Sequence, residues 1–184
     1  MSRSLVSSVS TTKLIDYSSI EIATRAADAF TRLYYTTYDS PTRVDDLPKF
    51  YRSSSTLTWN GNPCQGVEGV KKLIQDMPST KHEVQSYDCH PIPGLSAVSY
   101  SDGNTHATPT GFQPPSLLVT VSGNVTHGHG PAGNPVSTPA KSVDGQPRVF
   151  FQSFMLVPDP TAPIVKVGEV AKYYVDADAM RFVG

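Results

Sequence analysis

The residues that could carry out chemistry are few and scattered along the chain. His127 and His129 flank one glycine, with no carboxylate or cysteine at ligand spacing, so no metal site is expected. Cys64 and Cys89 form neither a disulfide framework nor a zinc pattern and are expected to be small apolar side chains. The other candidates are four acid–base groups, Asp28, His82, Asp88 and His90. No two of them stand at a spacing diagnostic of paired catalytic groups, and no cofactor is indicated.

Length and charge restrict the number of domains and the kinds of partner that the chain could bind. The chain has 184 residues, enough for one domain with a proper core. Its 15 Lys and Arg nearly balance 16 Asp and Glu, which argues against direct, sequence-specific binding of nucleic acid. No apolar run has membrane-spanning length, so no membrane partner is expected. We expect a flexible tail over residues 1–16 and a single domain over residues 17–184.

Three amphipathic segments predict helices. Ser18 and Glu21 fit a capping box that opens a helix of five to six turns, which Pro41 stops. A shorter helix is expected over Val44–Tyr51. Apolar residues three and four apart predict another helix over Val67–Met77. Each has one apolar stripe, so each is expected to lie on a sheet.

Strands dominate the rest of the chain, and the expected strands are Thr56–Trp59, Lys81–Ile92, Ser116–Thr126, Arg148–Val157 and Ile164–Val175. Asn60-Gly61 predicts a tight turn and Trp59 a core side chain, so Trp59, Asn60 and Gly61 are interpreted as structural. Residues 99–115 and 127–147 are rich in Gly, Pro and Ser and are expected to be long hairpin loops. Helices first and strands later predict an α+β fold, a curved antiparallel sheet with about three helices on one face.

The strand expected at Arg148–Val157 is apolar on both faces. Phe150, Phe154 and Leu156 alternate with Phe151, Met155 and Val157. A sheet covered by helices on one side and by water on the other should alternate apolar and polar residues. The face away from the helices is therefore covered either by a partner protein or by the long loops folding back over it.

Several short motifs, taken together, resemble the nuclear transport factor 2-like family. They are Ala26-Ala27-Asp28-x-Phe30-x-x-x-Tyr34-Tyr35-Thr36-Thr37, Leu57-x-Trp59-Asn60-Gly61-Asn62, Gly66, Met77-Pro78-Ser79 and Asp88-Cys89-x-Pro91. The likeness is greatest to the small subunits of the mRNA export receptor and covers about Ala23 to Ile92. The two long loops depart from the family's pattern.

The resemblance implies a cone-shaped fold and a non-catalytic subunit. Such a chain would pair through its sheet face with a large TAP-type mRNA export factor and shuttle between nucleus and cytoplasm. It would reach the repeat proteins of the nuclear pore through that complex. The resemblance also implies that Asp88 pairs with an arginine of the large subunit; otherwise Asp88 is a solvated aspartate at a strand edge. Strand alternation places Val84, Ser86 and His90 beside Asp88, and the expected interface also contains Phe150, Phe154 and Leu156.

Two other functions remain open for this fold. The cone hosts isomerases and dehydratases in other families, with an interior Asp or His as general base, and Asp28, His82, Asp88 and His90 are the candidates. Large side chains such as Phe30, Trp59 and Leu73 are expected to fill the cone instead. A homodimeric import carrier for a GDP-bound GTPase would need an acid-rimmed apolar cavity, and no acidic cluster was identified in the late strands.

Overall fold

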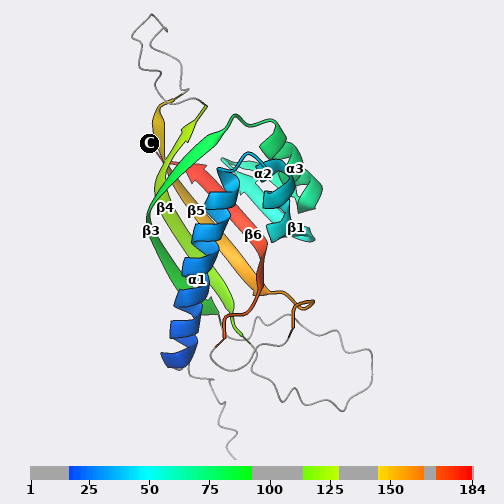
Figure 1. The fold of residues 1–184 in the computed structure, drawn as a ribbon, viewed down its shortest axis with the longest axis vertical. Helices are drawn as coiled ribbons and strands as arrows, with labels where there is room; N and C mark the ends of the chain where they lie inside the picture. The colour runs from blue at the N-terminus through cyan, green and yellow to red at the C-terminus, as the bar shows by residue number, and fades with distance from the viewer. Residues whose placement is uncertain (1–16, 93–113, 129–144, 164–168, 184) are drawn as a thin grey trace, which may run out of the picture.

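The computed structural model describes residues 17–92, 114–128, 145–163 and 169–183. In order along the chain, the elements of these segments are α1 (Tyr17–Tyr38), α2 (Arg43–Asp46), the 3₁₀ helix η1 (Leu47–Phe50), β1 (Tyr51–Trp59), β2 (Asn62–Gln65), α3 (Gly66–Gln75), β3 (Thr80–Ile92), β4 (Ser116–His127), β5 (Pro147–Pro158) and β6 (Tyr173–Phe182) (Figure 1). No helix within the described segments is long and apolar enough to cross a bilayer.

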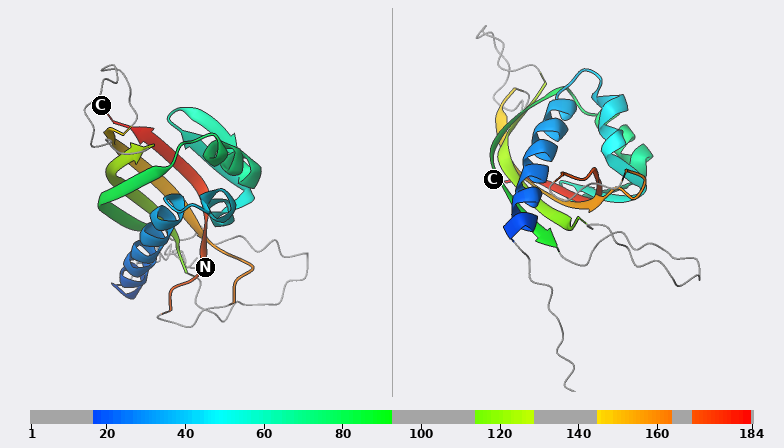
Figure 2. Two further views of the ribbon diagram at one scale, coloured as in Figure 1. Left: turned by 45° about the horizontal axis from the view of Figure 1, so that its top comes forward. Right: turned by 60° about the horizontal axis from the view of Figure 1, so that its bottom comes forward.

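The six strands form one sheet in the order β2-β1-β6-β5-β4-β3. Every neighbouring pair is antiparallel except β1 and β6, which are parallel, so the sequence-based expectation of a wholly antiparallel sheet was wrong at this pair. The helices lie on one side of the sheet, which curves around α1 (Figure 2). The expected α+β cone is confirmed.

Helix α1 packs its apolar stripe against the concave side of the sheet. Ile22, Ala26 and Phe30 are buried on that stripe, as the periodicity of the sequence predicted, whereas Leu33, which the periodicity also placed there, is 60% exposed. Tyr34 and Tyr38 continue it, and their rings pack against the aromatic side chains of the core. The last turn ends where Asp39 donates its backbone N–H to the carbonyl of Tyr35, just before Pro41.

The segment after α1 is less regular than a single helix. Instead of one helix over Val44–Tyr51, the chain forms the four-residue α2 and the four-residue η1, because Pro48 interrupts the helical hydrogen bonds. Arg43 is buried and donates from Nη2 to the carbonyls of Met77 and Pro78 at 2.6 and 2.8 Å. This side chain ties α2 to the end of the α3 segment.

Three strands differ from the sequence-based expectation, and one of them is β1, which begins at Tyr51 and not at Thr56. The short strand β2 was missed, although the Asn60-Gly61 turn before it was predicted correctly, with φ values of 47° and 88°. The last strand begins at Tyr173, not at Ile164; residues 164–168 lie outside the described residues. The two expected long loops fall mostly outside them too, at 93–113 and 129–144.

The curvature of the sheet has a local cause on β3 and β4. The pairing shifts between Val84 and Ser86, which leaves Gln85 as an extra residue in β3. Gly123 lies opposite on β4, and a Cβ there would approach the carbonyl oxygen of Glu83 to 2.2 Å. A glycine therefore allows the two backbones to come together where the sheet bends.

Candidate protein-interaction face

The convex face of the sheet, away from the helices, carries apolar side chains at its centre. We call this surface the outer face, and define it by Ser86, Asp88 and His90 of β3, Leu118, Thr120 and Ser122 of β4, Val149, Phe151, Ser153 and Met155 of β5, and Ala177, Ala179 and Arg181 of β6. The strand register arranges them in rows, one of which joins His90, Leu118, Met155 and Ala177. Phe151 is 41% exposed and Val149 48%, which is unusual for large apolar side chains at the middle of a sheet.

Strand β5 corrects part of the expected interface. The alternation of its side chains was predicted correctly, but Phe150, Phe154 and Leu156 point to the helix side and are fully buried in the core. They are therefore not surface residues. On the outer face the same strand presents Val149, Phe151, Ser153 and Met155, because consecutive residues of a strand point to opposite faces.

Strand β3 corrects one more residue of that set. Ser86, Asp88 and His90 are exposed on the outer face, as strict alternation predicted. Val84 is not beside them, because the extra residue Gln85 changes the register and turns Val84 toward the core. On the same inward side, Tyr87 donates its hydroxyl to the Asp28 carboxylate of α1 at 3.0 Å.

Asp88 occupies an edge position in a row of small side chains. It pairs across the strands with Thr120, which faces Ser153, which in turn faces Ala179. This row runs between the larger apolar side chains of Met155 and Phe151. The outer face therefore has a row of small side chains between Met155 and Phe151, with the carboxylate of Asp88 at one end.

The interior of the cone contains a polar cluster that sequence reasoning missed. Asp178 is 4% exposed and accepts hydrogen bonds from Tyr51 Oη at 2.7 Å and Gln152 Nε2 at 2.9 Å. Tyr34 Oη lies 2.7 Å from Tyr51 Oη, and Tyr35 Oη donates to Gln152 Oε1 at 2.8 Å. Burial raises the pKa of Asp178 to about 6, against the lowering effect of these hydrogen bonds.

A signal for this cluster was present in the sequence. In β6, Asp178 stands two residues before the core residue Met180, so the two side chains share the inward face of the strand. A carboxylate at such a position requires buried partners. Gln152 carries the same signal in β5, between Phe150 and Phe154. Neither could be paired with the tyrosines of α1 from one sequence.

Little space remains inside the cone. The interior cavity that Tyr38, Trp59, His82 and Asp178 help to line measures about 10 Å³. That volume corresponds to about one water molecule, whereas ligand pockets measure roughly 300–1,000 Å³. Trp59 is half-buried at the border of the core and packs edge-on against Phe182 at 5.5 Å. The cavity beside Asp178 is therefore too small for an organic substrate.

The four expected acid–base groups are not brought together. Asp28 is on the surface of α1, where it pairs with Arg32, and Asp88 and His90 are on the outer face. Only the His82 side chain is enclosed, and its Nδ1 lies 2.6 Å from Asp39 Oδ1. Burial alone would raise the pKa of Asp39, but hydrogen bonds and charge from His82, with a bond from Thr80, lower it overall. This pair joins the end of α1 to β3.

Two further expectations concern metals and thiols. No group of three or more His, Cys, Asp or Glu side chains within the described segments could hold a metal ion. Burial raises the pKa of the Cys89 thiol to about 11, so it stays protonated and packs beneath α1 as a small apolar group. His129 lies outside the described residues, so the expectation that His127 and His129 form no metal site stays a prediction.

Comparisons with known proteins agree with this architecture. The model of the nuclear transport factor 2 (NTF2) domain matches residues 26–132. NTF2-related export protein 2 of Homo sapiens is 28% identical over 163 residues, 89% of each chain. NTF2-related export protein 2 of Bos taurus is 30% identical over 144 residues, 78% of this chain and 79% of that one.

A solved structure has the same fold. A chain of the Chaetomium thermophilum Mex67 NTF2-like domain complexed with Mtr2 superposes with a TM-score of 0.55 at 19% identity, covering 88% of this chain and 99% of that chain. At that identity the likeness concerns the fold alone. The domain match extends over more than half of the sequence, and the chain belongs to the nuclear transport factor 2 (NTF2) domain family.

Proposed function

We propose that the chain is a non-catalytic subunit that forms a heterodimer with a larger mRNA export factor and stabilises it. Relatives over most of the chain are named NTF2-related export proteins, and Mtr2 occurs in complex with the NTF2-like domain of Mex67. A partner that binds only the folded state of each chain stabilises both by mass action. The pair would serve the export of mRNA through nuclear pores and would shuttle between nucleus and cytoplasm.

The observation that carries this proposal is the open outer face. Phe151 and Val149 are exposed on β5, an interior strand of the sheet whose inward side chains Phe150 and Phe154 are fully buried. A stable interface buries about 800 Å² per partner and concentrates its energy in a few apolar and aromatic residues. In the proposed interface, Phe151 and Met155 are central, while Ser86, Asp88 and His90 form one polar edge. An arginine of the partner would pair with Asp88.

The filled cone supports a non-catalytic role. An isomerase or dehydratase needs a cavity that holds its substrate beside a general base. Here the enclosed carboxylate of Asp178 is already engaged by Tyr51 and Gln152, and the adjoining cavity measures only about 10 Å³. The enzyme is therefore the weaker proposal, and it would require a large opening of the core.

The import-carrier alternative also has less support. It requires an acid-rimmed apolar cavity, and although Asp176 and Asp178 of β6 are acidic, Asp178 lies inside the core. A carrier of this kind would also pair with a second copy of itself. Measuring the mass of the purified chain alone therefore separates the two proposals.

The decisive experiment is co-expression with a large export factor followed by light scattering. We expect a one-to-one complex, and Phe151→Asp should weaken it by about 30-fold or more, because a central aromatic residue contributes 2 kcal/mol or more. Asp88→Arg should prevent pairing while the chain stays folded. Arg32→Glu, on the exposed side of α1, is the matched control and should leave the complex unchanged.

The possible results distinguish an error in the proposed heterodimer from an error in the residues assigned to its interface. A well-behaved monomer that ignores the large factor would contradict the proposal itself. A complex that tolerates Phe151→Asp would show that the partner binds elsewhere. If Phe151→Asp weakens the complex and Asp88→Arg does not, Asp88 lies outside the interface and the apolar centre remains part of it.

A further inference from the structure

A second apolar surface lies on the helix side of the molecule, away from the outer face. It is a groove of about 340 Å³ between α1, η1 and the residues that precede β6. Its apolar lining includes Ala29, Phe30, Leu33, Phe50, Val170 and Tyr173. We call it the α1 groove. Its volume falls within the range of pockets that bind a small ligand, and it is large enough for one or two side chains of a peptide.

The floor of the α1 groove is rigid and its upper wall is open. Phe30 is buried and stacks edge-on against Phe154 at 5.0 Å and Phe50 at 6.0 Å, so the aromatic floor is held by the core. Leu33 is 60% exposed, the most exposed large apolar side chain in the described segments. Ala29 beside it is small, which leaves space above Phe30. The groove is thus preformed to receive a large apolar side chain.

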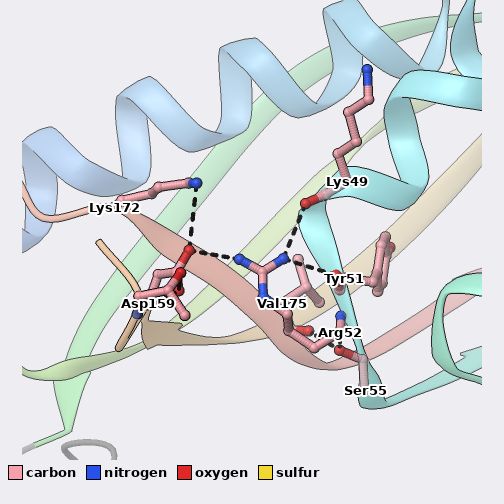
Figure 3. Close-up of polar contacts among 8 residues, drawn as sticks. Lys49, Tyr51, Arg52, Ser55, Asp159, Lys172 and Val175 are labelled. Carbon is pink, nitrogen blue, oxygen red and sulfur yellow. Dashed lines mark hydrogen bonds and ion pairs between the residues drawn. The ribbon is translucent and has the colours of Figure 1, made fainter. Parts of the chain in front are cut away.

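The charge at the rim of the α1 groove is basic. Lys49 and Lys172 line it from opposite sides, and no acidic residue lines it. Their side chains are 71% and 68% exposed, and each is in one ion pair, Lys49 with Asp46 at 2.6 Å and Lys172 with Asp159 at 3.4 Å, so a carboxylate of a ligand would have to compete with Asp46 at Lys49. In Figure 3 both lysines extend on the α1 side, with the guanidinium of Arg52 between them. The rim therefore favours carboxylates on the bound segment.

Lys172 shares the carboxylate of Asp159 beneath it with Arg52. Asp159 is fully buried and its Oδ2 already accepts Arg52 Nη2 at 2.6 Å, while Lys172 Nζ lies farther away, at 3.4 Å (Figure 3). Thr161 donates to the other oxygen of Asp159. Arg52 is further fixed by the carbonyl of Tyr51 at 3.0 Å. One buried carboxylate thus faces two cations, so the positive charge of Lys172 is only partly compensated.

From these features we propose that the α1 groove docks an acidic segment of another protein that carries a large apolar side chain. The side chain would occupy the space over Phe30 beside Leu33, and flanking carboxylates would contact Lys49 and Lys172. Because the groove and the outer face lie on opposite sides of the sheet, one chain can engage both partners together. The chain would then connect the partner at its outer face to a second protein. This inference goes beyond the proposed heterodimer and does not depend on it.

The test uses labelled twelve-residue peptides and the full chain in fluorescence polarisation. The first peptide has one Phe among Asp and Glu residues, the second replaces Phe with Ser, and the third replaces the acids with Asn and Gln. We expect the first peptide alone to bind measurably. Its affinity should fall by about fivefold or more on Leu33→Ser and on Lys172→Gln, and should weaken with added salt.

Two variants calibrate the result. Asp46→Ala removes the carboxylate that pairs with Lys49 at 2.6 Å and should tighten binding of the acidic peptide by about twofold to threefold. Phe151→Asp changes the outer face only and should leave peptide binding unchanged. Circular dichroism of each variant checks that the fold is intact.

Several results would overturn the proposal. Equal binding of the acidic and the uncharged Phe peptides would remove the role of the lysines. Binding that is unaffected by Leu33→Ser, or that is lost on Phe151→Asp, would place the peptide outside the α1 groove. If none of the three peptides binds, the groove does not dock an acidic segment of another protein. That result would also be obtained if a segment of this chain occupies the groove, and it overturns the proposal in either case. None of these results depends on whether the large export factor binds.

Discussion

Phe150 and Phe151 are neighbours on one strand and have opposite surroundings. Phe150 is fully buried, with its ring 5.6 Å from Tyr35 and 5.4 Å from His82. Phe151 is 41% exposed on the outer face, opposite Arg181 of β6. The same residue type therefore stabilises the fold on one face of the sheet and is left open on the other. This difference separates what holds the domain together from what is available to a partner.

The two faces also treat polar groups differently. On the concave side, the carboxylate of Asp178 and the amide of Gln152 satisfy each other and the hydroxyls of two tyrosines. On the outer face, Asp88 and Ser86 are exposed at the edge of the sheet. A buried network with all partners present costs the fold little, whereas its loss would be expensive. Chemistry in the interior would therefore have to disrupt the interactions that stabilise it.

The largest expected effect is the contrast between Phe154→Ala and Phe151→Ala. Phe154 contacts Phe30 and Tyr34 at the centre of the core, so its truncation should lower the free energy of unfolding by about 3–5 kcal/mol. Phe151→Ala should change it by no more than about 0.5 kcal/mol. Urea denaturation of the isolated chain measures both. Similar losses for the two variants would mean that the outer face is covered within the monomer.

The second prediction concerns pH and the buried carboxylate. Because the pKa of Asp178 is about 6 when folded and lies near 4 when unfolded, the folded state binds its proton more tightly. Its contribution to stability is complete below about pH 4 and is lost as the pH rises through 6. The loss amounts to about 3 kcal/mol. In Asp178→Asn, this decline between pH 4 and 6 should disappear from denaturation curves.

Asp159 provides the internal comparison for that experiment. Burial would raise its pKa, but hydrogen bonds from Thr161 and the charge of Arg52 lower the pKa to about 2. Its contribution is therefore present above pH 4 and is lost as the pH falls through 2, the reverse direction and a different range. A decline between pH 4 and 6 that persists in Asp178→Asn would assign the effect to another group.

Much of the fold could be predicted from local patterns. The apolar stripe from Ile22 to Phe30, the Asn60-Gly61 turn and the alternation along β4 each depend on neighbours in sequence, and each was predicted correctly. The motifs that resemble the NTF2 domain family then fixed how these elements assemble. Alternation on β5 also indicated that both faces are apolar.

What could not be predicted depends on contacts between distant residues. The extra residue Gln85 arises from the pairing of β3 with β4, and it changed the face of Val84. Which side of β5 the helices cover depends on how α1 crosses the sheet, so Phe150 was assigned to the wrong face. The network around Asp178 joins β6 to α1, β1 and β5, and no local pattern links them.

The third prediction tests the shape of the outer face through Gly123. In Gly123→Ala, the added Cβ would lie 2.2 Å from the carbonyl oxygen of Glu83, a backbone atom that cannot move without changing the bend of the sheet. We expect a loss of about 1–3 kcal/mol in the free energy of unfolding. Binding to the export factor should weaken further than the stability loss explains, because the outer face flattens. Gly61→Ala is a poor control, since its φ of 88° adds strain of its own.

The smallest expected effect comes from Tyr51→Phe, which removes one donor from Asp178 without changing the packing of the ring. The hydroxyl of Tyr51 lies 2.7 Å from Asp178 Oδ2, and its loss should lower stability at neutral pH by about 1–2 kcal/mol. Because the hydrogen bond favours the ionised carboxylate, the pKa of Asp178 should rise above 6 in the variant. The decline in stability with pH should then extend to higher pH, as denaturation at several pH values would show. If the range of the decline stays the same, Tyr51 does not hold the charge of Asp178, and Gln152 and Tyr34 are its effective donors.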